Sequence, residues 1–173
     1  MSQNVICCRS LVHTPKGDNM LNEARSILIS RYEEIRGILF EMYPYVSPTK
    51  LGVTDREECS VFSVKDNAIV LNFPELNLRD VIEDEHQNLQ TLLAQSQGPP
   101  AWLRELIHET IHAFEHRVIC QSTTTEGKEL FTQVQAARCG PIDAQHAGPF
   151  YSAVHHAAST LGIEPLQFIK NCL

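Results

Sequence analysis

Between residues 20 and 42, hydrophobic residues recur at steps of three and four, which is the pattern of an amphipathic helix. Asp18 or Asn19 is suited to cap the start of this helix, and Pro44 is suited to end it. Residues 1–17 show no such period, so we expect them to form a loosely ordered N-terminal segment. The apolar stripe consists of Met20, Leu21, Ala24, Ile27, Leu28, Tyr32, Ile35, Ile38, Leu39 and Met42.

Residues 51–73 change to short runs of aliphatic and aromatic residues, which is typical of strands. Lys65, Asp66 and Asn67 separate two of these runs and are typical of a hairpin turn. Pro74 ends the last run. The pattern therefore predicts a small antiparallel sheet of two or three strands.

Helical spacing returns after the sheet. Helices and strands do not alternate strictly along the chain. This order of elements indicates an α+β domain, with helices packed against the small sheet. We expect residues 18–173 to form this single domain. The predicted helices span residues 78–96, 102–120, 129–137 and 148–162, followed by a short one from Pro165.

Composition narrows the class of protein. The chain has 173 residues, 43% of them hydrophobic and 20% charged, which fits one soluble globular domain. No run approaches the roughly 18 apolar residues of a membrane span, and the N-terminus lacks the features of a secretory signal, so we expect a cytoplasmic protein without a membrane partner. The six cysteines form no Cys-x-x-Cys pair, which argues against a disulfide scaffold and a zinc ribbon.

The charge distribution bears on partners. The 14 Lys and Arg residues are scattered among 21 Asp and Glu, giving a net charge of -7. Affinity for a phosphate backbone needs clustered cations that displace counterions. We therefore expect no strong nucleic-acid binding, although folding can still gather Arg104, Arg117, Lys128 and Arg138.

A His-Glu-x-x-His motif occupies residues 108–112, within the predicted helix 102–120. His108 and His112 stand about 40° apart around the helix and about 6 Å apart along it, so both imidazoles can reach one metal ion. Glu109 points about 100° away from His108 and can instead take a proton from a metal-bound water. An apolar stripe suited to the core lies beside them: Leu103, Ile107, Ile111, Phe114 and Val118.

A third metal ligand must come from elsewhere in the chain. His116 extends the polar stripe, but it lies about 12 Å along the axis from His108, too far for one ion. His146 is the better candidate, because it directly precedes a predicted helix and can point into a cleft. Glu126 or Glu129 is the alternative, as the third ligand of a thermolysin-like site.

The two histidine motifs together resemble those of the SprT-like (Spartan-type) zinc metallopeptidases. In that family a His-Glu-x-x-His helix is followed by His-Gly-x-x-Phe at the start of another helix. The second motif here spans residues 146–150, with Ala147 in place of the usual glycine. Residues 68–74 are similar to the family's strand before the active-site helix, and the resemblance covers roughly residues 20–163.

The resemblance implies a zincin-like metalloprotease core in which His108, His112 and His146 bind Zn²⁺ and Glu109 is catalytic. The chain departs from many relatives, because it lacks a C-terminal zinc ribbon and basic DNA-binding extensions. Residues 78–96 also look like an insertion. The chemistry carries over more directly than the substrate does.

The expected function is therefore zinc-dependent endopeptidase activity, in which a zinc-activated water attacks the peptide bond and Glu109 is the general base. The strand at 68–73 is expected to pair with an extended substrate, which favours unfolded or flexible protein segments. The alternatives are a non-catalytic zinc-containing binding module of the same fold and the thermolysin-like peptidase. His155 or His156 is either a transition-state donor or a surface residue, and Tyr151 is either a donor or part of the core.

Overall fold

The structure is a computed structural model that describes residues 15–48, 50–55, 59–137 and 146–172. Over these residues the chain is an α+β protein with seven α-helices and one three-stranded sheet. In chain order the elements are α1 (Pro15–Leu39), β1 (Lys50–Thr54), β2 (Val61–Ser63), β3 (Ala68–Asn72), α2 (Glu75–Glu83), α3 (Leu89–Leu93), α4 (Ala101–Phe114), the π-helix η1 (Glu115–Ile119), α5 (Thr125–Ala137), α6 (Gly148–Leu161) and α7 (Pro165–Cys172).

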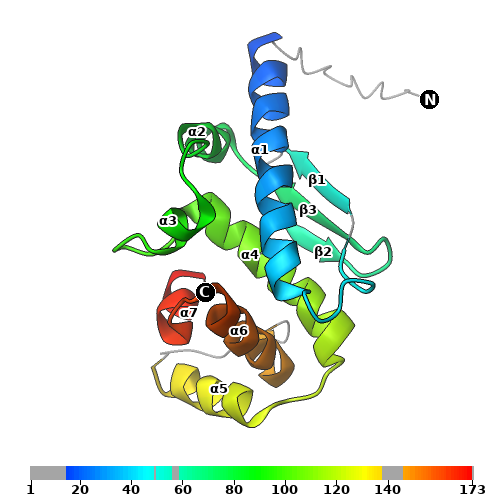
Figure 1. Ribbon diagram of the computed structural model, residues 1–173, viewed down its shortest axis with the longest axis vertical. Coiled ribbons are helices and arrows are strands. Elements are labelled where there is room, and N and C mark those ends of the chain that lie inside the picture. The colour runs from blue at the N-terminus through cyan, green and yellow to red at the C-terminus, as the bar shows by residue number, and fades with distance from the viewer. Residues whose placement is uncertain (1–14, 49, 56–58, 138–145, 173) are drawn as a thin grey trace, which may run out of the picture.

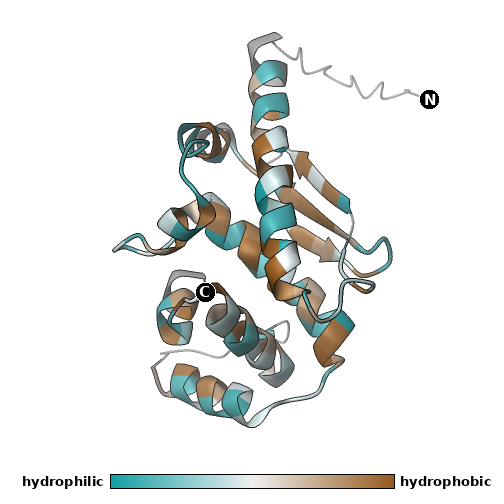
Figure 2. Cartoon of the chain, in the orientation of Figure 1, coloured by the Kyte–Doolittle hydropathy of each residue, from teal (hydrophilic) through white to brown (hydrophobic). Residues whose placement is uncertain are grey.

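The sheet lies to one side of the view in Figure 1, with α1 and α4 packed on it. Helices α5, α6 and α7 gather at the other end of the molecule, where α6 packs on α4, α5 and α7. Figure 2 shows hydrophobic and hydrophilic residues alternating along α1 and a mostly hydrophobic β3. Among the described helices, none combines the length and apolar character needed to cross a membrane.

The sheet is mixed, so the prediction of an antiparallel sheet is wrong for one of its strands. β3 is the central strand, with β2 antiparallel on one side and β1 parallel on the other. The β2–β3 hairpin was predicted from its turn, in which Asn67 has a positive φ of 48°. Side chains alternate with a period of two in both kinds of strand, so the hydrophobic pattern does not encode the direction of β1.

Helix α1 carries the predicted apolar stripe but differs at both ends. It begins at Pro15, ahead of the predicted cap at Asp18 or Asn19, so the last part of the expected loose segment is helical. Residues 1–14 lie outside the described part of the chain. The helix ends at Leu39, and Met42, expected on the buried stripe, is 77% exposed.

The predicted helix 78–96 is two helices, because a polar turn interrupts it after α2. The Asp84 carboxylate accepts hydrogen bonds from Trp102 Nε1 at 2.8 Å and from Gln87 Nε2 at 2.7 Å. Asn88 then caps α3 by accepting a hydrogen bond from the Thr91 N–H at 2.8 Å. Side chains that hydrogen-bond nearby groups in this way favour turns and caps over helix interiors.

Helices α5 and α6 cross in close contact at Gly127. Gly127 lies so close to Ser152 that a Cβ on the glycine would come within 2.7 Å of Ser152 Cα and 2.8 Å of its backbone nitrogen. The Thr124 hydroxyl accepts a hydrogen bond from the Gly127 N–H at 3.1 Å, so α5 begins earlier than the predicted residue 129. The missing side chain at Gly127 therefore sets how closely α5 can cover α6.

Candidate metal centre

Helix α4 carries the first two candidate ligands beside an apolar face that is buried in the core. Leu103, Ile107 and Ile111 are fully buried on the predicted apolar stripe. His108 and His112 lie on the neighbouring face and are only partly buried. The helix therefore holds two imidazoles at a fixed spacing while leaving them accessible from outside the core.

The structure brings His146 to these two histidines. His146 Nε2 lies 3.3 Å from His108 Nε2, which in turn lies 3.1 Å from His112 Nε2. One nitrogen from each ring falls within 4.8 Å of the other two, and the group is a possible metal site. His146 comes just before α6, so the packing of α6 against α4 closes the triad.

Phe150 forms an apolar wall behind the triad. Its ring is buried, and its centroid lies 5.5 Å from the ring of His108, 4.7 Å from that of His112 and 4.7 Å from that of His146. Contact with one rigid ring restricts the orientation of all three imidazoles. The second sequence motif thus supplies both a candidate ligand and the aromatic residue that supports it.

Two of the three nitrogen–nitrogen separations fit a small tetrahedral ion. Ligands about 2.05 Å from zinc at tetrahedral angles are separated by about 3.3 Å, and structural and catalytic zinc sites use imidazole nitrogens in this way. The separations of 3.1 and 3.3 Å that His108 makes with His112 and His146 agree with this edge length. A donor set of three imidazoles also suits zinc better than calcium or magnesium, which prefer oxygen.

Glu109 lies beside the triad without belonging to it. Its side chain is buried, with the residue only 5% exposed. Burial raises the pKa of the carboxyl group to about 7, while the charge of His112 and a hydrogen bond from the Phe62 backbone lower the pKa and Glu105 raises it. A carboxyl group that titrates near neutral pH is suited to accept and release a proton.

Glu115 is a second carboxylate at the site, and the sequence reasoning missed it. Its Oε2 lies 3.4 Å from Nδ1 of His112, the ring nitrogen that faces away from the other two histidines. The available signal was the spacing of three residues between them, which puts both side chains on one helix face. Such spacing is common on helices, so it did not stand out beside the stronger motif.

The other residues considered from the sequence lie outside the triad. His116 is exposed on η1, where its ring lies 5.9 Å from that of Phe62. Glu126 and Glu129, the alternative third ligands, are exposed on α5 and are not part of the histidine group. The geometry therefore favours His146 over either glutamate as the third ligand.

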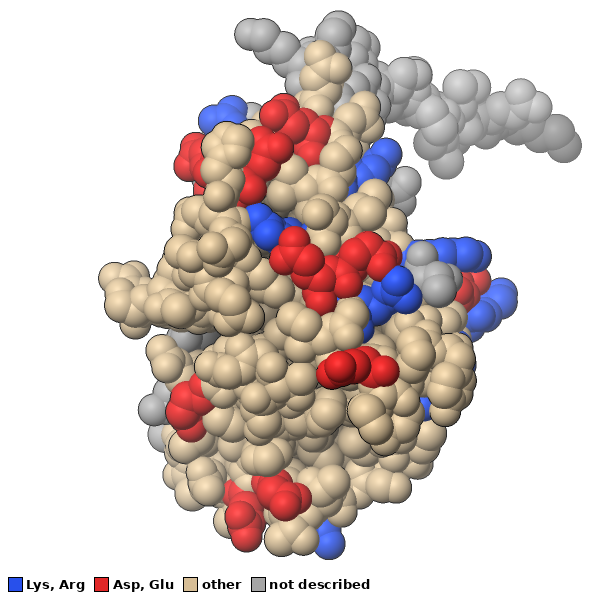
Figure 3. Space-filling model, viewed as in Figure 1, with Lys and Arg blue, Asp and Glu red and all other residues tan. Residues whose placement is uncertain are grey.

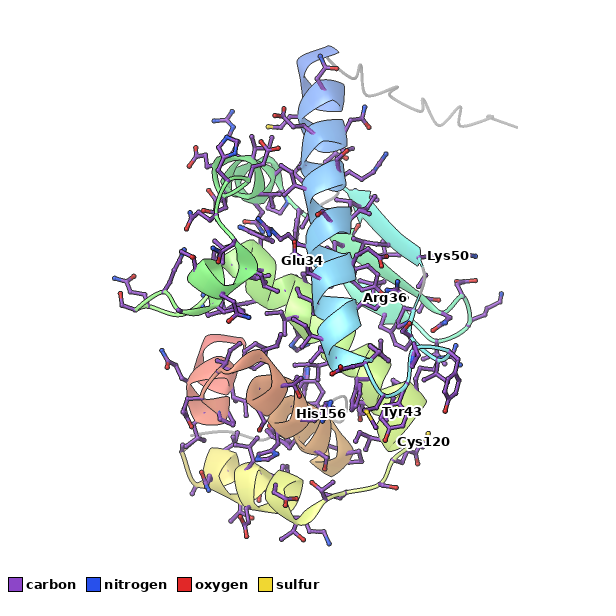
Figure 4. The ribbon with its side chains drawn as sticks, in the orientation of Figure 1. Glu34, Arg36, Tyr43, Lys50, Cys120 and His156 are labelled. Atoms are coloured by element: carbon purple, nitrogen blue, oxygen red, sulfur yellow. The ribbon has the colours of Figure 1, made fainter. Side chains whose placement is uncertain are left out.

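Two residues of α6 belong to the packing rather than to the triad. Tyr151 is buried, and its ring contacts Phe131 and Phe150 at centroid distances of 5.2 and 5.8 Å. His156 stacks on Phe114 and lies between α6 and the lower end of α1 (Figure 4). Both rings therefore pack against aromatic residues.

Comparison with known proteins gave no match. No family model matches the chain, and none of the curated proteins or solved structures compared with it matches significantly. The resemblance to the SprT-like family therefore has its specific signal in two histidine motifs, residues 108–112 and 146–150.

Proposed function

We propose that the protein is a zinc-dependent metalloendopeptidase of the SprT-like, zincin-like type. The observation that carries the proposal is the convergence of three imidazole nitrogens beside a buried carboxylate that is not one of the ligands. A catalytic zinc site combines three protein ligands with an open position and a nearby general base. The three protein ligands would be His108, His112 and His146, and the general base would be Glu109.

In this proposal each residue has one task. His108, His112 and His146 hold the zinc ion through Nε2, and Phe150 keeps the rings in place. Bound zinc supplies Lewis acidity, polarising the scissile carbonyl and lowering the pKa of water. The Glu109 carboxylate accepts the proton of the attacking water and delivers it to the nitrogen of the leaving amine.

The strand expected to pair with substrate requires a correction. Residues 68–73 were predicted to form the edge of the cleft, but β3 is the central strand and is paired on both sides. β1 and β2 are the two edge strands, and the backbone of Phe62 in β2 is hydrogen-bonded to Glu109. We therefore assign substrate pairing to β2, where an extended peptide segment would lie beside the general base.

This mode of binding favours particular substrates. An extended strand is available in an unfolded protein or a flexible loop and is buried in a compact domain, so the substrate is a protein or peptide segment of that kind. A binding module in which zinc has only a structural role is the second reading. The position of Glu109 outside the ligand group favours the enzyme, because a structural site has no use for a buried base there.

A Glu109→Gln variant tests the proposal on an unfolded protein such as reduced casein. We expect wild-type protein loaded with zinc to cleave it and the variant to lose activity by at least about 100-fold, while zinc content stays the same. Glu129→Gln, which removes an exposed carboxylate from α5, is the matched control and should retain full activity. Full activity in Glu109→Gln would overturn the mechanism, and a fourth protein ligand to zinc would favour the binding module.

A further inference from the structure

His112 makes a contact through each of its two ring nitrogens. Its Nε2 faces the other candidate ligands, 3.1 Å from His108 Nε2. Its Nδ1 lies 3.4 Å from Oε2 of Glu115. The imidazole is thus held between the triad and a carboxylate.

The chain geometry places Glu115 at the junction between α4 and η1. Its backbone N–H bonds to the carbonyl groups of Ile111 and His112, and its own carbonyl accepts the Cys120 N–H at 2.9 Å in the wider π-helical turn. Short π-helical segments within helices are frequent at functional sites. Both backbone groups of Glu115, its N–H and its carbonyl, are therefore hydrogen-bonded.

The two side chains are largely withdrawn from water. The His112 side chain is 15% exposed and that of Glu115 is 14% exposed. In such surroundings a hydrogen bond to a carboxylate is stronger than at an open surface. An ordinary pair at this helical spacing on a solvent-exposed face is weaker and is not directed at a candidate ligand.

We infer that Glu115 is a positioning residue for the metal site, and this inference rests on the proposed function. Its carboxylate accepts a hydrogen bond from Nδ1–H of His112, which keeps the proton on Nδ1 and leaves the lone pair of Nε2 free to bind the ion. The same hydrogen bond fixes the plane of the His112 ring. Ligating histidines in zinc proteins are commonly held in this way by a carboxylate, a backbone carbonyl or water.

Zinc affinity is the first test, measured by competition with a fluorescent chelator on the full chain. We expect Glu115→Ala to weaken zinc binding about 10- to 100-fold. Glu115→Gln should weaken it less, since the amide oxygen still accepts the hydrogen bond without the charge. Glu129→Gln, which removes a negative charge from an exposed position, should bind zinc as the wild type does.

A spectroscopic measurement separates positioning from a general loss of stability. In the ¹⁵N-labelled zinc form, the Nδ1–H proton of His112 should be protected from exchange with water, and this protection should be lost in Glu115→Ala. Circular dichroism shows whether each variant is folded. If Glu115→Ala is not folded, the comparison is made between the wild type and Glu115→Gln.

The outcomes distinguish this inference from the proposed function. A wild-type chain that binds no zinc would overturn the metallopeptidase proposal itself. Suppose that the wild type binds zinc and Glu115→Ala binds it equally well, with the same proton protection. Only the role of Glu115 is then overturned. Where Glu115→Ala does not fold, Glu115→Gln is compared in its place. Graded weakening from glutamate through glutamine to alanine supports it.

Discussion

His156 of α6 stacks almost face to face on Phe114, the last residue of α4, with ring centroids 4.4 Å apart and ring planes 8° apart. Burial lowers the pKa of His156 below its ordinary value, as does the charge of His155, while a hydrogen bond to the Leu39 backbone acts in the opposite direction. The neutral form of the His156 imidazole is therefore favoured at this contact between the end of α4 and α6.

This contact predicts a pH dependence of stability. Because the pKa of His156 is lower in the folded state, the unfolded state binds more protons, and the contribution to stability is lost as pH falls below about 6.5. We expect His156→Phe, which keeps a stacked ring and removes the titration, to lose less stability between neutral and mildly acidic pH. Urea unfolding of both proteins across that range measures the difference, and parallel stability curves would contradict the assignment.

Metal content tests the third ligand. His146→Ala should lose stoichiometric zinc after dialysis against buffer with a weak chelator, because two imidazoles alone hold the ion poorly. Glu126→Ala and Glu129→Ala should retain it, since both residues are exposed on α5. If His146→Ala keeps its zinc while a glutamate variant loses it, the thermolysin-like arrangement replaces the one proposed.

Gly127→Ala tests the close crossing of α5 and α6. The added Cβ would meet the Ser152 hydroxyl and also the Ser152 backbone, with Cα at 2.7 Å, so turning the hydroxyl away would not remove the overlap. We expect a loss of about 1–3 kcal/mol in the free energy of unfolding, the usual cost of overpacking. Gly37→Ala in α1 is the matched control: its Cβ would meet nothing within 4 Å, so it should be neutral or stabilising by up to about 1 kcal/mol.

Nucleic-acid binding is predicted to be weak. On the face shown in Figure 3, Lys and Arg side chains lie in separate small groups among Asp and Glu. Arg104 donates to the Pro99 carbonyl at 2.8 Å and Arg117 to Asn67 at 3.1 Å, while Arg138 lies outside the described residues. Fluorescence anisotropy with labelled oligonucleotides at about 0.15 M salt should give no sub-micromolar dissociation constant. Finding one would show that the folded chain gathers enough cations to bind DNA.

Features that depend on residues close together in the sequence could be predicted, and features that depend on residues far apart in the sequence could not. The helix with His108 and His112 follows from its spacing, and the helices near Gly148 and Pro165 follow from residues that start and stop helices. The direction of β1 could not be predicted, because strand pairing is decided by partners distant in sequence. The break at Asp84 depends on its hydrogen bond with Trp102, which exists only in the folded chain.

The candidate metal centre could likewise be predicted only in part. His146 could be proposed because it precedes a helix, but its distance from His108 depends on how α6 packs against α4. The contact of Phe150 with all three rings has no signal in spacing alone. The edge position of β2 was missed because the order of strands in the sheet differs from their order in the chain.

The three histidines come from two separate parts of the fold, since His108 and His112 lie on α4 and His146 directly precedes α6. An ion shared among them would act as a removable crosslink between these helices, adding stability that grows with the free metal concentration. Chelation would then loosen the contact between α4 and α6. In a cell, metal supply would thereby influence how long the protein survives.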